Sequence, residues 1–373
     1  MKTALVCDWL TNVGGAEKVL LEIHKMYPDA PIYTSQYDKK GIDWFRDADV
    51  RTGKLQKYPV KLRRFLGPLR QRYFSKLDLS EYDLVISVTG AEAKAVNVPN
   101  GKHICYCHVP TQYYWGMYDD YVKNPGFGIL NPFVRFFFKL FVGPLRKADL
   151  KAAQKPDQFV TISEYAKEQI KQYYGRDAII VHPPVEIGTF SERLKCAWKP
   201  FDAHFQPFAY YITTSRQVNW KRIDLAVKAC MMAQRYLIVI GEGPEHKKLV
   251  KMAEGSKHIK FLKVMNKEKL AEYLADAKGY LFPSLEPFGI APVEALAAGC
   301  PVIAYKQGGA RDYIKEGKNG IFFDEQTAKS LAEAILKFET KKFDREKVKK
   351  SVDDFDTKRF DEELKAVIKK VSE

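Results

Sequence analysis

The sequence predicts an α/β protein with two Rossmann-like domains, each built on a doubly wound parallel sheet, that face a central cleft. Three observations support this fold class. The chain has 373 residues, enough for two hydrophobic cores of ordinary size. Short β-branched or aromatic runs alternate with amphipathic helical patterns. The strand candidates are almost continuously apolar, as strands are when helices cover both faces of a parallel sheet.

The strand candidates form two series, one in each half of the chain. The first series comprises TALVC (3–7), DLVISV (83–88), HICYC (103–107), QFVTIS (158–163) and AIIVH (178–182). The second comprises FAYYITT (208–214), YLIVIG (236–241), IKFLK (259–263), GYLFP (279–283) and PVIAY (301–305), with helical patterns at 222–234 and 266–277 between them.

Two prolines in HPPVEIGTF interrupt the pattern after the first series. We therefore predict a first domain at 1–187, a linker at 188–206 and a second domain at 207–354. The last segment, about 355–373, reads as a helix that packs back on the first domain.

Composition excludes several classes of protein. With 46% hydrophobic and 29% charged residues the chain is expected to be soluble and globular. No window reaches the roughly 18 uncharged apolar residues of a membrane span, and the start MKTALVCDWL reads as a buried strand rather than a signal peptide. The cysteines fall in predicted core segments, which favours structural roles and a reduced, cytosolic compartment. They are Cys7, Cys105, Cys107, Cys196, Cys230 and Cys300.

The net charge of +15 is concentrated in two stretches that also carry apolar bulk. Residues 51–77 hold nine basic and no acidic side chains, and residues 131–151 set five phenylalanines among basic residues that include Arg135, Lys139, Arg146 and Lys147. This pairing favours an anionic membrane surface over nucleic acid, of which no motif is present; an ordinary solvated helix is the remaining alternative. The candidate membrane or acceptor residues are Arg63, Arg64, Arg70, Arg72, Tyr113, Phe137 and Lys139.

Two loops that follow predicted strands are candidates for ligand binding. Gly14 and Gly15 open a helix after the first strand, where the backbone can approach a ligand, although a tight connection would use the same residues. In TTSRQVNWK, Arg216 and Lys221 follow the first strand of the second domain, at the edge where doubly wound sheets bind ligands. Arg and Lys both bind phosphate oxygens, while a solvated loop is the alternative.

The stretch SLEPFGIAPVEALAAG adds a predicted helix start. Gly289 lets the chain turn, and Pro292 fits the first helical position because its missing N–H costs nothing there. The N–H groups of Phe288, Gly289 and Ile290 would then point at an anion. A carboxylate in the next turn, Glu294, can accept from a ribose diol, and Glu286 at the loop mouth can hold sugar hydroxyls.

These motifs, followed by GGARDYIKEGKNGIFF, resemble glycosyltransferase family 4, a family of retaining enzymes of the GT-B fold. The first half, with CDWLTNVGGAEKVL and HICYCHVPTQYYW, is similar to the O-antigen mannosyltransferase branch. The likeness runs from residue 3 to about 325. Gln112 and Gly116 depart from residues that are frequent in that branch, Arg and Asp respectively, near the expected acceptor side.

The resemblance implies a role for each motif. It assigns the donor diphosphate to Arg216 and Lys221, with help from the backbone of Gly15 and of residues 288–290. It places the ribose on Glu294, the transferred sugar on Glu286 and His108, and the base near Val264 and Met265. The implied catalytic residues are His108, Arg216, Lys221 and Glu286.

The implied reaction moves a hexose, most favourably mannose from GDP-mannose, onto a lipid-linked glycan in surface polysaccharide assembly. No first-domain motif supplies a carboxylate nucleophile, so we expect front-face displacement. No Asp-x-Asp motif lies near the crevice, so we expect no metal and no cofactor. The expected location is the cytoplasmic face of the cell membrane. Transfer from UDP- or other nucleotide sugars, a nucleotide-sugar epimerase and a non-catalytic sugar-nucleotide-binding scaffold are the alternatives.

Overall fold

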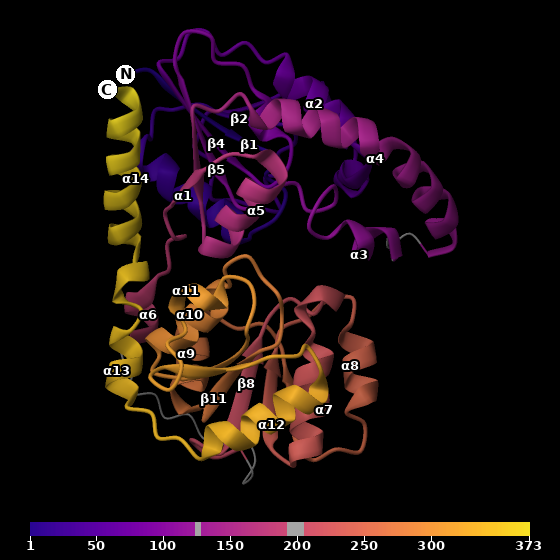
Figure 1. The fold of residues 1–373 in the computed structure, drawn as a ribbon, viewed down its shortest axis with the longest axis vertical. Coiled ribbons are helices and arrows are strands. Elements are labelled where there is room, and N and C mark those ends of the chain that lie inside the picture. Colours follow the sequence, from indigo (N-terminus) through magenta and orange to yellow (C-terminus); the bar gives the residue numbers. More distant parts are fainter. Residues whose placement is uncertain (124–127, 192–204) are drawn as a thin grey trace. The chain divides into compact units, whose positions relative to one another are not determined.

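A computed structural model of the chain describes residues 1–123, 128–191 and 205–373 (Figure 1). The described residues divide into two compact units, residues 1–184 with 360–373, and residues 185–359. Each unit contains one all-parallel sheet with helices on both faces, which confirms the predicted fold class.

The sheet of the first unit has seven strands in the order β3-β2-β1-β4-β5-β6-β7. Its strands are β1 (Thr3–Cys7), β2 (Ile32–Thr34), β3 (Val50–Thr52), β4 (Leu84–Thr89), β5 (Lys102–Cys107), β6 (Gln158–Thr161) and β7 (Ala178–Ile180). Its helices are α1 (Gly15–Met26), α2 (Gly67–Ser75), α3 (Tyr118–Lys123), α4 (Asn131–Ala153) and α5 (Glu164–Tyr174), with 3-10 turns η1 (Lys54–Lys57), η2 (Val60–Phe65), η3 (Ala93–Ala95) and η4 (Gly128–Leu130).

The sheet of the second unit has six strands in the order β10-β9-β8-β11-β12-β13. Its strands are β8 (Tyr210–Thr214), β9 (Tyr236–Ile240), β10 (Ile259–Leu262), β11 (Gly279–Phe282), β12 (Val302–Tyr305) and β13 (Gly320–Phe323). Its helical elements are α6 (Ile187–Ser191), η5 (Asn219–Lys221), α7 (Ile223–Ala233), α8 (His246–Met252), α9 (Lys267–Asp276), α10 (Ile290–Ala297), α11 (Ala310–Tyr313), α12 (Ala328–Glu339), α13 (Arg345–Lys350) and η6 (Asp353–Phe355).

All ten predicted strands are present, with ends that move by at most a few residues. Local chemistry explains several helix ends. The Ser163 hydroxyl accepts from the Ala166 N–H at the start of α5, and Gly175 ends that helix at a φ of 67°. The predicted strands did not include β2, β3 and β13.

Around the predicted linker the structure is only partly described. Residues 187–191 form α6, so the regular structure extends beyond residue 187, where the first domain was predicted to end. Most of the predicted linker, with Cys196, lies outside the described residues. The five described cysteines are free and buried.

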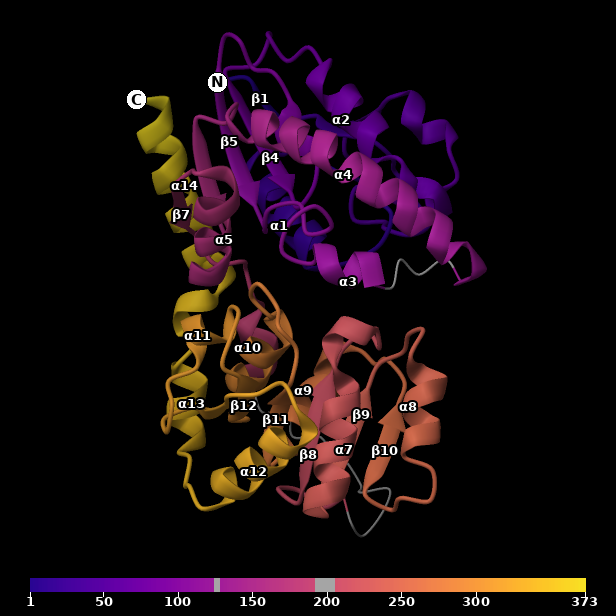
Figure 2. The same cartoon turned by 45° about the vertical axis from the view of Figure 1, so that its right-hand side comes forward.

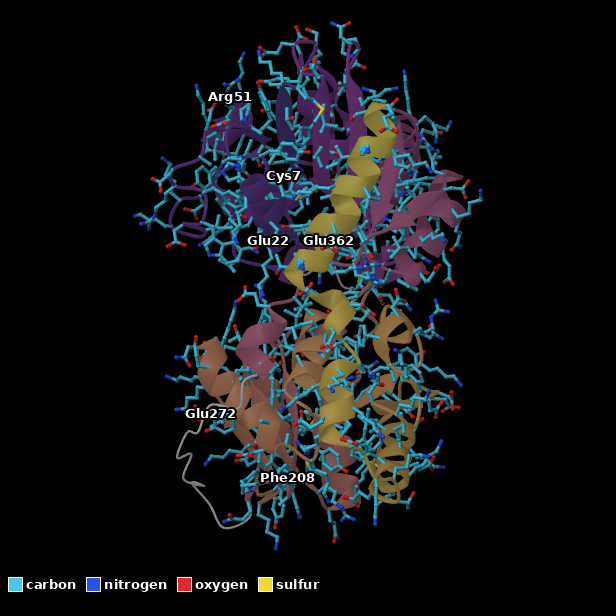
Figure 3. All side chains as sticks on the ribbon, turned by 90° about the vertical axis from the view of Figure 1, so that its left-hand side faces the viewer. Cys7, Glu22, Arg51, Phe208, Glu272 and Glu362 are labelled. Carbon is cyan, nitrogen blue, oxygen red and sulfur yellow. The ribbon has the colours of Figure 1, made fainter. Side chains whose placement is uncertain are left out.

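The terminal helix α14 (Thr357–Ser372) lies, from Phe360 onward, with the first unit (Figure 3). Its apolar stripe is buried, and the Phe360 ring meets Tyr106 of β5 edge-on at 6.0 Å. Leu364, one turn further along, is fully buried. The helix therefore closes one part of the first unit's core, although its sequence neighbours belong to the second unit.

We expect Leu364→Ala to lower the free energy of unfolding by about 2–5 kcal/mol, since it removes a buried side chain and leaves a cavity. Lys365→Ala, at an exposed position of the same helix, is the matched control and should change stability by less than about 0.5 kcal/mol. Chemical denaturation of the two variants checks this. Equal stability would show that α14 does not contribute to the core.

Candidate functional site

In the second unit, the loops that follow β8 and β11 meet at the point where the strand order reverses. Lys221, at the end of η5, lies with its Nζ 2.5 Å from Oε2 of Glu286. The Ser284 hydroxyl donates to the other carboxylate oxygen of Glu286 at 2.8 Å. Because β8 and β11 are neighbours in the sheet, their carboxyl ends bring these distant residues together.

The N-terminus of α10 lies immediately after Glu286 and is held by a second loop. Gly309 donates its N–H to the Glu286 carbonyl at 2.9 Å, and the Tyr313 hydroxyl donates to the Phe288 carbonyl at 2.9 Å. Gly289 caps the helix at a φ of 92°, and a Cβ there would lie 2.6 Å from the Phe282 ring. The turn therefore requires glycine for both conformation and space.

The prediction for Pro292 needs correction. The helix α10 begins at Ile290, so Pro292 is its third residue rather than its first. The physical reason for a proline is unchanged, since N–H groups throughout the first turn lack a partner within the helix. Glu294, half-buried, lies in the turn that follows.

The remaining predicted donor residues lie on loops of the same unit. Arg216 is exposed in the loop after β8, while Val264, 71% exposed, and Met265 lie between β10 and α9. Beside Arg216, the buried Gln217 amide donates to the Gly241 carbonyl at 2.7 Å, and its oxygen lies 2.7 Å from His246 Nδ1. The sequence analysis missed Gln217, which ties the arginine loop to the glycine turn after β9.

In the first unit, Gly14 caps α1 and Gly15 is its first residue, as predicted. Sequence reasoning missed Glu17, whose buried carboxylate lies over Gly14, 2.7 Å from where a Cβ of that residue would be. Burial raises the pKa of Glu17 from its ordinary 4.5 to about 7, against the opposing charge of the Arg63 guanidinium.

Asp8, directly after β1, joins the carboxyl ends of two neighbouring strands. Its carboxylate accepts from the Thr89 hydroxyl at 2.8 and 3.0 Å, from the Gly90 N–H at 3.0 Å and from the Ala93 N–H at 2.7 Å. Burial nevertheless raises its pKa, and the charge of Glu92 adds to the effect. This edge of the first sheet is therefore rich in acidic groups.

His108 lies half-buried just past the end of β5, as predicted. Burial lowers the pKa of its imidazole to about 4, so the ring is neutral near pH 7. Its buried Nε2 has no hydrogen-bond partner among the residues that the structure describes. A neutral ring with an unused nitrogen can exchange a hydrogen bond with a ligand hydroxyl.

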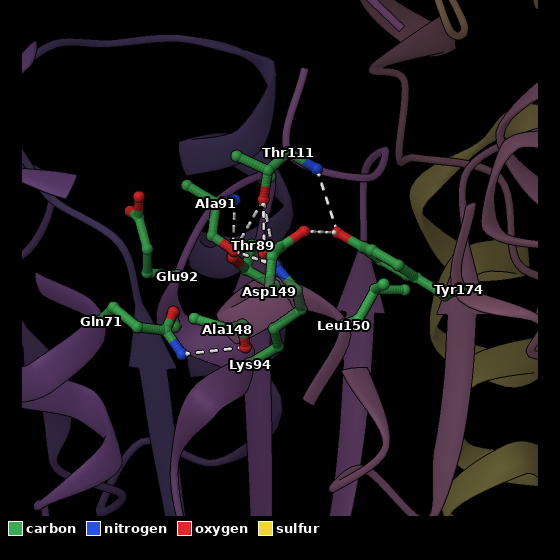
Figure 4. A network of polar contacts seen from close by, with 12 residues as sticks. Gln71, Thr89, Ala91, Glu92, Lys94, Thr111, Ala148, Asp149, Leu150 and Tyr174 are labelled. Atoms are coloured by element: carbon green, nitrogen blue, oxygen red, sulfur yellow. Dashed lines mark hydrogen bonds and ion pairs between the residues drawn. The ribbon is translucent and has the colours of Figure 1, made fainter. Parts of the chain in front are cut away.

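The loop that follows His108 is held by a buried ion pair (Figure 4). Lys94 Nζ lies 2.6 Å from Asp149 Oδ1, and both side chains are 1% exposed. The Asp149 carboxylate also accepts from Thr111, Trp115 and Tyr174 at 2.8–3.0 Å. Since Thr111 and Trp115 belong to the loop, α4 fixes its course through one aspartate.

Two residues predicted to face a membrane or an acceptor are instead buried or paired within the unit. Arg70 is 2% exposed, forms an ion pair with Glu92 at 2.8 Å and covers the Trp9 ring. Tyr113 donates to Glu92 at 2.5 Å. Both side chains pair with the buried carboxylate of Glu92. The run of basic residues in the sequence gives no sign of this pairing.

The other members of that set fall into two groups. Arg63 is half-buried and donates to Asn12 at 3.0 Å and to Thr11, so it faces the loop after β1. Arg72, Phe137 and Lys139 are exposed, as a surface role requires. The side chain of Arg64 is outside the described part of the structure.

Among the described residues, no helix is long and apolar enough to span a bilayer. No group of three or more His, Cys, Asp or Glu side chains within the described ranges is arranged to hold a metal ion.

We expect Asp149→Asn to lower the free energy of unfolding by about 3–5 kcal/mol, because it leaves the Lys94 ammonium buried without a counter-charge. Adding Lys94→Met should recover much of that loss, since the uncompensated charge is then removed. Urea denaturation of the single and double variants measures both effects. A double variant as unstable as the single one would contradict this account.

We expect Glu17 to make the protein less stable as the pH rises from 4.5 to about 7. The folded state keeps its proton over that window while the unfolded state releases it, so folding is weakened by up to about 3 kcal/mol for the shift in pKa. Glu17→Gln should remove this contribution. The measurement is the difference in unfolding free energy between variant and wild type at pH 5 and pH 8, with the exposed Glu362→Gln as control. A difference that does not change with pH would disprove the assignment.

Comparison with protein families places part of this site in a known context. Residues 198–354 match the family model described as glycosyl transferases group 1. That segment contains both Lys221 and Glu286, and all of α10.

Curated relatives are distant. The α-1,3/1,6-mannosyltransferase alg2 of Schizosaccharomyces pombe is 22% identical over 363 residues, 83% of this chain and 68% of its own length. A GDP-mannose-dependent α-mannosyltransferase of Corynebacterium glutamicum is 29% identical over 167 residues, 43% of this chain and 38% of its own. An uncharacterized glycosyltransferase of Methanocaldococcus jannaschii is 24% identical over 205 residues; this chain spans 52% of its length.

Solved structures share the whole fold. Anabaena HepE in complex with UDP has a TM-score of 0.69 at 18% identity, and covers 99% of this chain and 100% of its own. Sucrose-phosphate synthase from Thermosynechococcus elongatus has a TM-score of 0.70 at 16% identity, with 99% of both chains covered. The chain therefore has the GT-B fold, and its residues 198–354 match the model of glycosyl transferases group 1.

Proposed function

We propose that this protein is a retaining hexosyltransferase that moves mannose from GDP-mannose onto a glycan acceptor carried on a polyprenyl diphosphate. The observation that carries the proposal is the contact of Lys221 with Glu286 just before the N-terminus of α10. A cation and a helix N-terminus both favour a diphosphate, and a neighbouring carboxylate accepts hydrogen bonds from sugar hydroxyls.

The proposed chemistry is a displacement on one face of the sugar. The bond from the anomeric carbon to the diphosphate oxygen breaks, the bond to the acceptor oxygen forms on the same side, and the leaving diphosphate takes the acceptor's proton. Lys221, Arg216 and the amides at the start of α10 stabilise the charge that develops on the diphosphate. Fixed donors of this kind contribute about 3–4 kcal/mol each. We propose that they act without a metal ion or another cofactor.

His108 would contribute hydrogen bonding rather than charge. Its imidazole is neutral near pH 7, because burial keeps its pKa at about 4. A neutral ring can position a hydroxyl of the transferred sugar without competing with the cations for the diphosphate.

The choice of donor follows from the relatives rather than from a side chain of this protein. Two distant relatives are named mannosyltransferases, and one of those is named for its dependence on GDP-mannose. A solved structure of the same fold contains UDP, so a UDP-sugar is the main alternative donor. A non-catalytic scaffold that binds sugar nucleotides is the second alternative.

We expect GDP and GDP-mannose, without metal, to raise the thermal stability of the protein more than UDP or ADP compounds do. A ligand at 100 times its dissociation constant stabilises the folded state by about 2.7 kcal/mol. Lys221→Ala should abolish the shift, whereas Lys228→Ala, an exposed lysine on α7, should not. Transfer of radiolabelled mannose in the presence of a chelator then tests catalysis without metal.

Each other outcome has a definite meaning. A shift with UDP compounds alone would replace the donor but keep the site. Binding of a nucleotide sugar with no transfer to any lipid extract would favour the scaffold. No shift with any nucleotide would overturn the proposed function, and loss of transfer with chelator would overturn the metal-independent mechanism.

A further inference from the structure

The helix α4 carries a ridge of large apolar side chains that the first unit leaves exposed. These side chains recur at the spacing of one helical face. We call them the α4 ridge: Phe133, Phe136, Phe137, Leu140 and Phe141, which are 53–68% exposed. Single exposed apolar residues are ordinary, but five on one face of one helix indicate a surface that meets an apolar partner.

The other half of α4 accounts for why the ridge is exposed. Val142, Asp149, Ala152 and Ala153 are buried, and they hold the C-terminal part of the helix in the first unit. That part lies beside α2, as Figures 1 and 2 both show. The Gln71 amide donates to the Ala148 carbonyl at 3.5 Å. The N-terminal part, which carries the ridge, continues from this anchored part in the same helix.

The exposed charged side chains of α4 itself are all positive. On α4 the exposed charged residues are Lys139, Lys147 and Lys151, whereas its one acid, Asp149, is buried. The segment 54–76, which ends in α2, adds exposed lysines and an arginine beside exposed Val60, Leu62, Phe65 and Leu69. Those basic residues are Lys54, Lys57, Lys61, Arg72 and Lys76. The exposed Asp119 and Asp120 are on α3, which is held to the ridge end of α4 by Arg135, a donor to the Val122 and Lys123 carbonyls, so two acids also lie near the ridge.

We propose that the α4 ridge inserts into the surface of an anionic bilayer, with the lysines of α4 and of segment 54–76 resting on the lipid headgroups. Apolar bulk flanked by basic side chains is the pattern that such surfaces bind. A second copy of this chain fits less well, because its own lysines would face these across the contact. The inference rests on the proposed function only for the statement that the acceptor is a lipid.

The same helix also holds the loop that follows His108. Arg146 of α4 donates to the Tyr114 carbonyl at 2.6 Å, and its guanidinium covers the rings of Trp115 and Tyr118 at 5.0 and 4.7 Å. Asp149 accepts from Thr111 and Trp115 of that loop. Insertion of the ridge would therefore bring this loop close to the headgroups, where a lipid-linked sugar is presented.

Flotation of the full-length protein with vesicles tests this inference without any donor or acceptor. The vesicles are phosphatidylcholine alone, or a two-to-one mixture of phosphatidylcholine and phosphatidylglycerol. The test variant is Phe136→Ser with Phe137→Ser and Phe141→Ser. The matched control is Met232→Ser with Val250→Ser and Leu336→Ser, three exposed apolar residues of the second unit.

We expect the wild type to bind the anionic vesicles, the ridge variant to bind them at least tenfold more weakly, and the control to bind like the wild type. Vesicle binding by the ridge variant equal to the wild type would overturn the inference, as would no binding by the wild type. A concentration-dependent dimer that the ridge variant breaks, without vesicle binding, would overturn it in favour of self-association. Nucleotide-induced stabilisation of the ridge variant shows that it is folded. If no nucleotide stabilises the wild type or either variant, while the wild type still binds the vesicles and the ridge variant does not, the proposed function is rejected and the docking surface stands.

Discussion

The carboxyl ends of parallel strands gather at one edge of each sheet, and the candidate sites of this protein depend on that constraint. Both sheets have their first strand in the interior, with the order reversing beside it. In the first unit this brings Asp8 to Thr89, and in the second it brings Lys221 to Glu286. Neither pair is close in sequence, so the topology creates both clusters.

The ion pairs at these edges differ in burial. The more buried pair is suited to holding a loop in place, and the more exposed pair is suited to exchanging its contacts with a ligand. Lys94 and Asp149 are 1% exposed, so separating them would leave a charge in the interior at a cost of about 3–5 kcal/mol. Lys221 and Glu286 are 24% and 18% exposed, so water and an incoming ligand can replace each partner. The first pair can hold a loop in one position, whereas the second can open to a diphosphate and a sugar.

The sequence predicts which residues directly follow a strand. It does not predict contacts between residues that are far apart in the chain. Ten of the strands and the positions of Lys221 and Glu286 at strand ends follow from local pattern. The partner of Lys94 does not, since Asp149 lies on another element and nothing in GAEAKAV indicates a buried charge. For the same reason the basic run at 51–77 reads as one surface, although Arg70 turns inward to Glu92.

The two units differ in how much substitution their loops can accept, and this difference bears on how substrate specificity could vary. In the second unit, Gly309 has no room for a Cβ, which would lie 2.3 Å from the Pro287 carbonyl oxygen, so the donor loop tolerates little change. In the first unit, Thr111 and Trp115 of the loop after His108 donate to Asp149, whereas the Gln112 side chain and the exposed Gly116 take no part in those hydrogen bonds. Substitutions at those two positions can alter the surface offered to a proposed acceptor without changing the hydrogen bonds that Thr111 and Trp115 make to Asp149. Asp149 and the α4 ridge belong to one helix. Under our proposal the chemistry of the acceptor can therefore change while its proposed source, a membrane surface, stays the same.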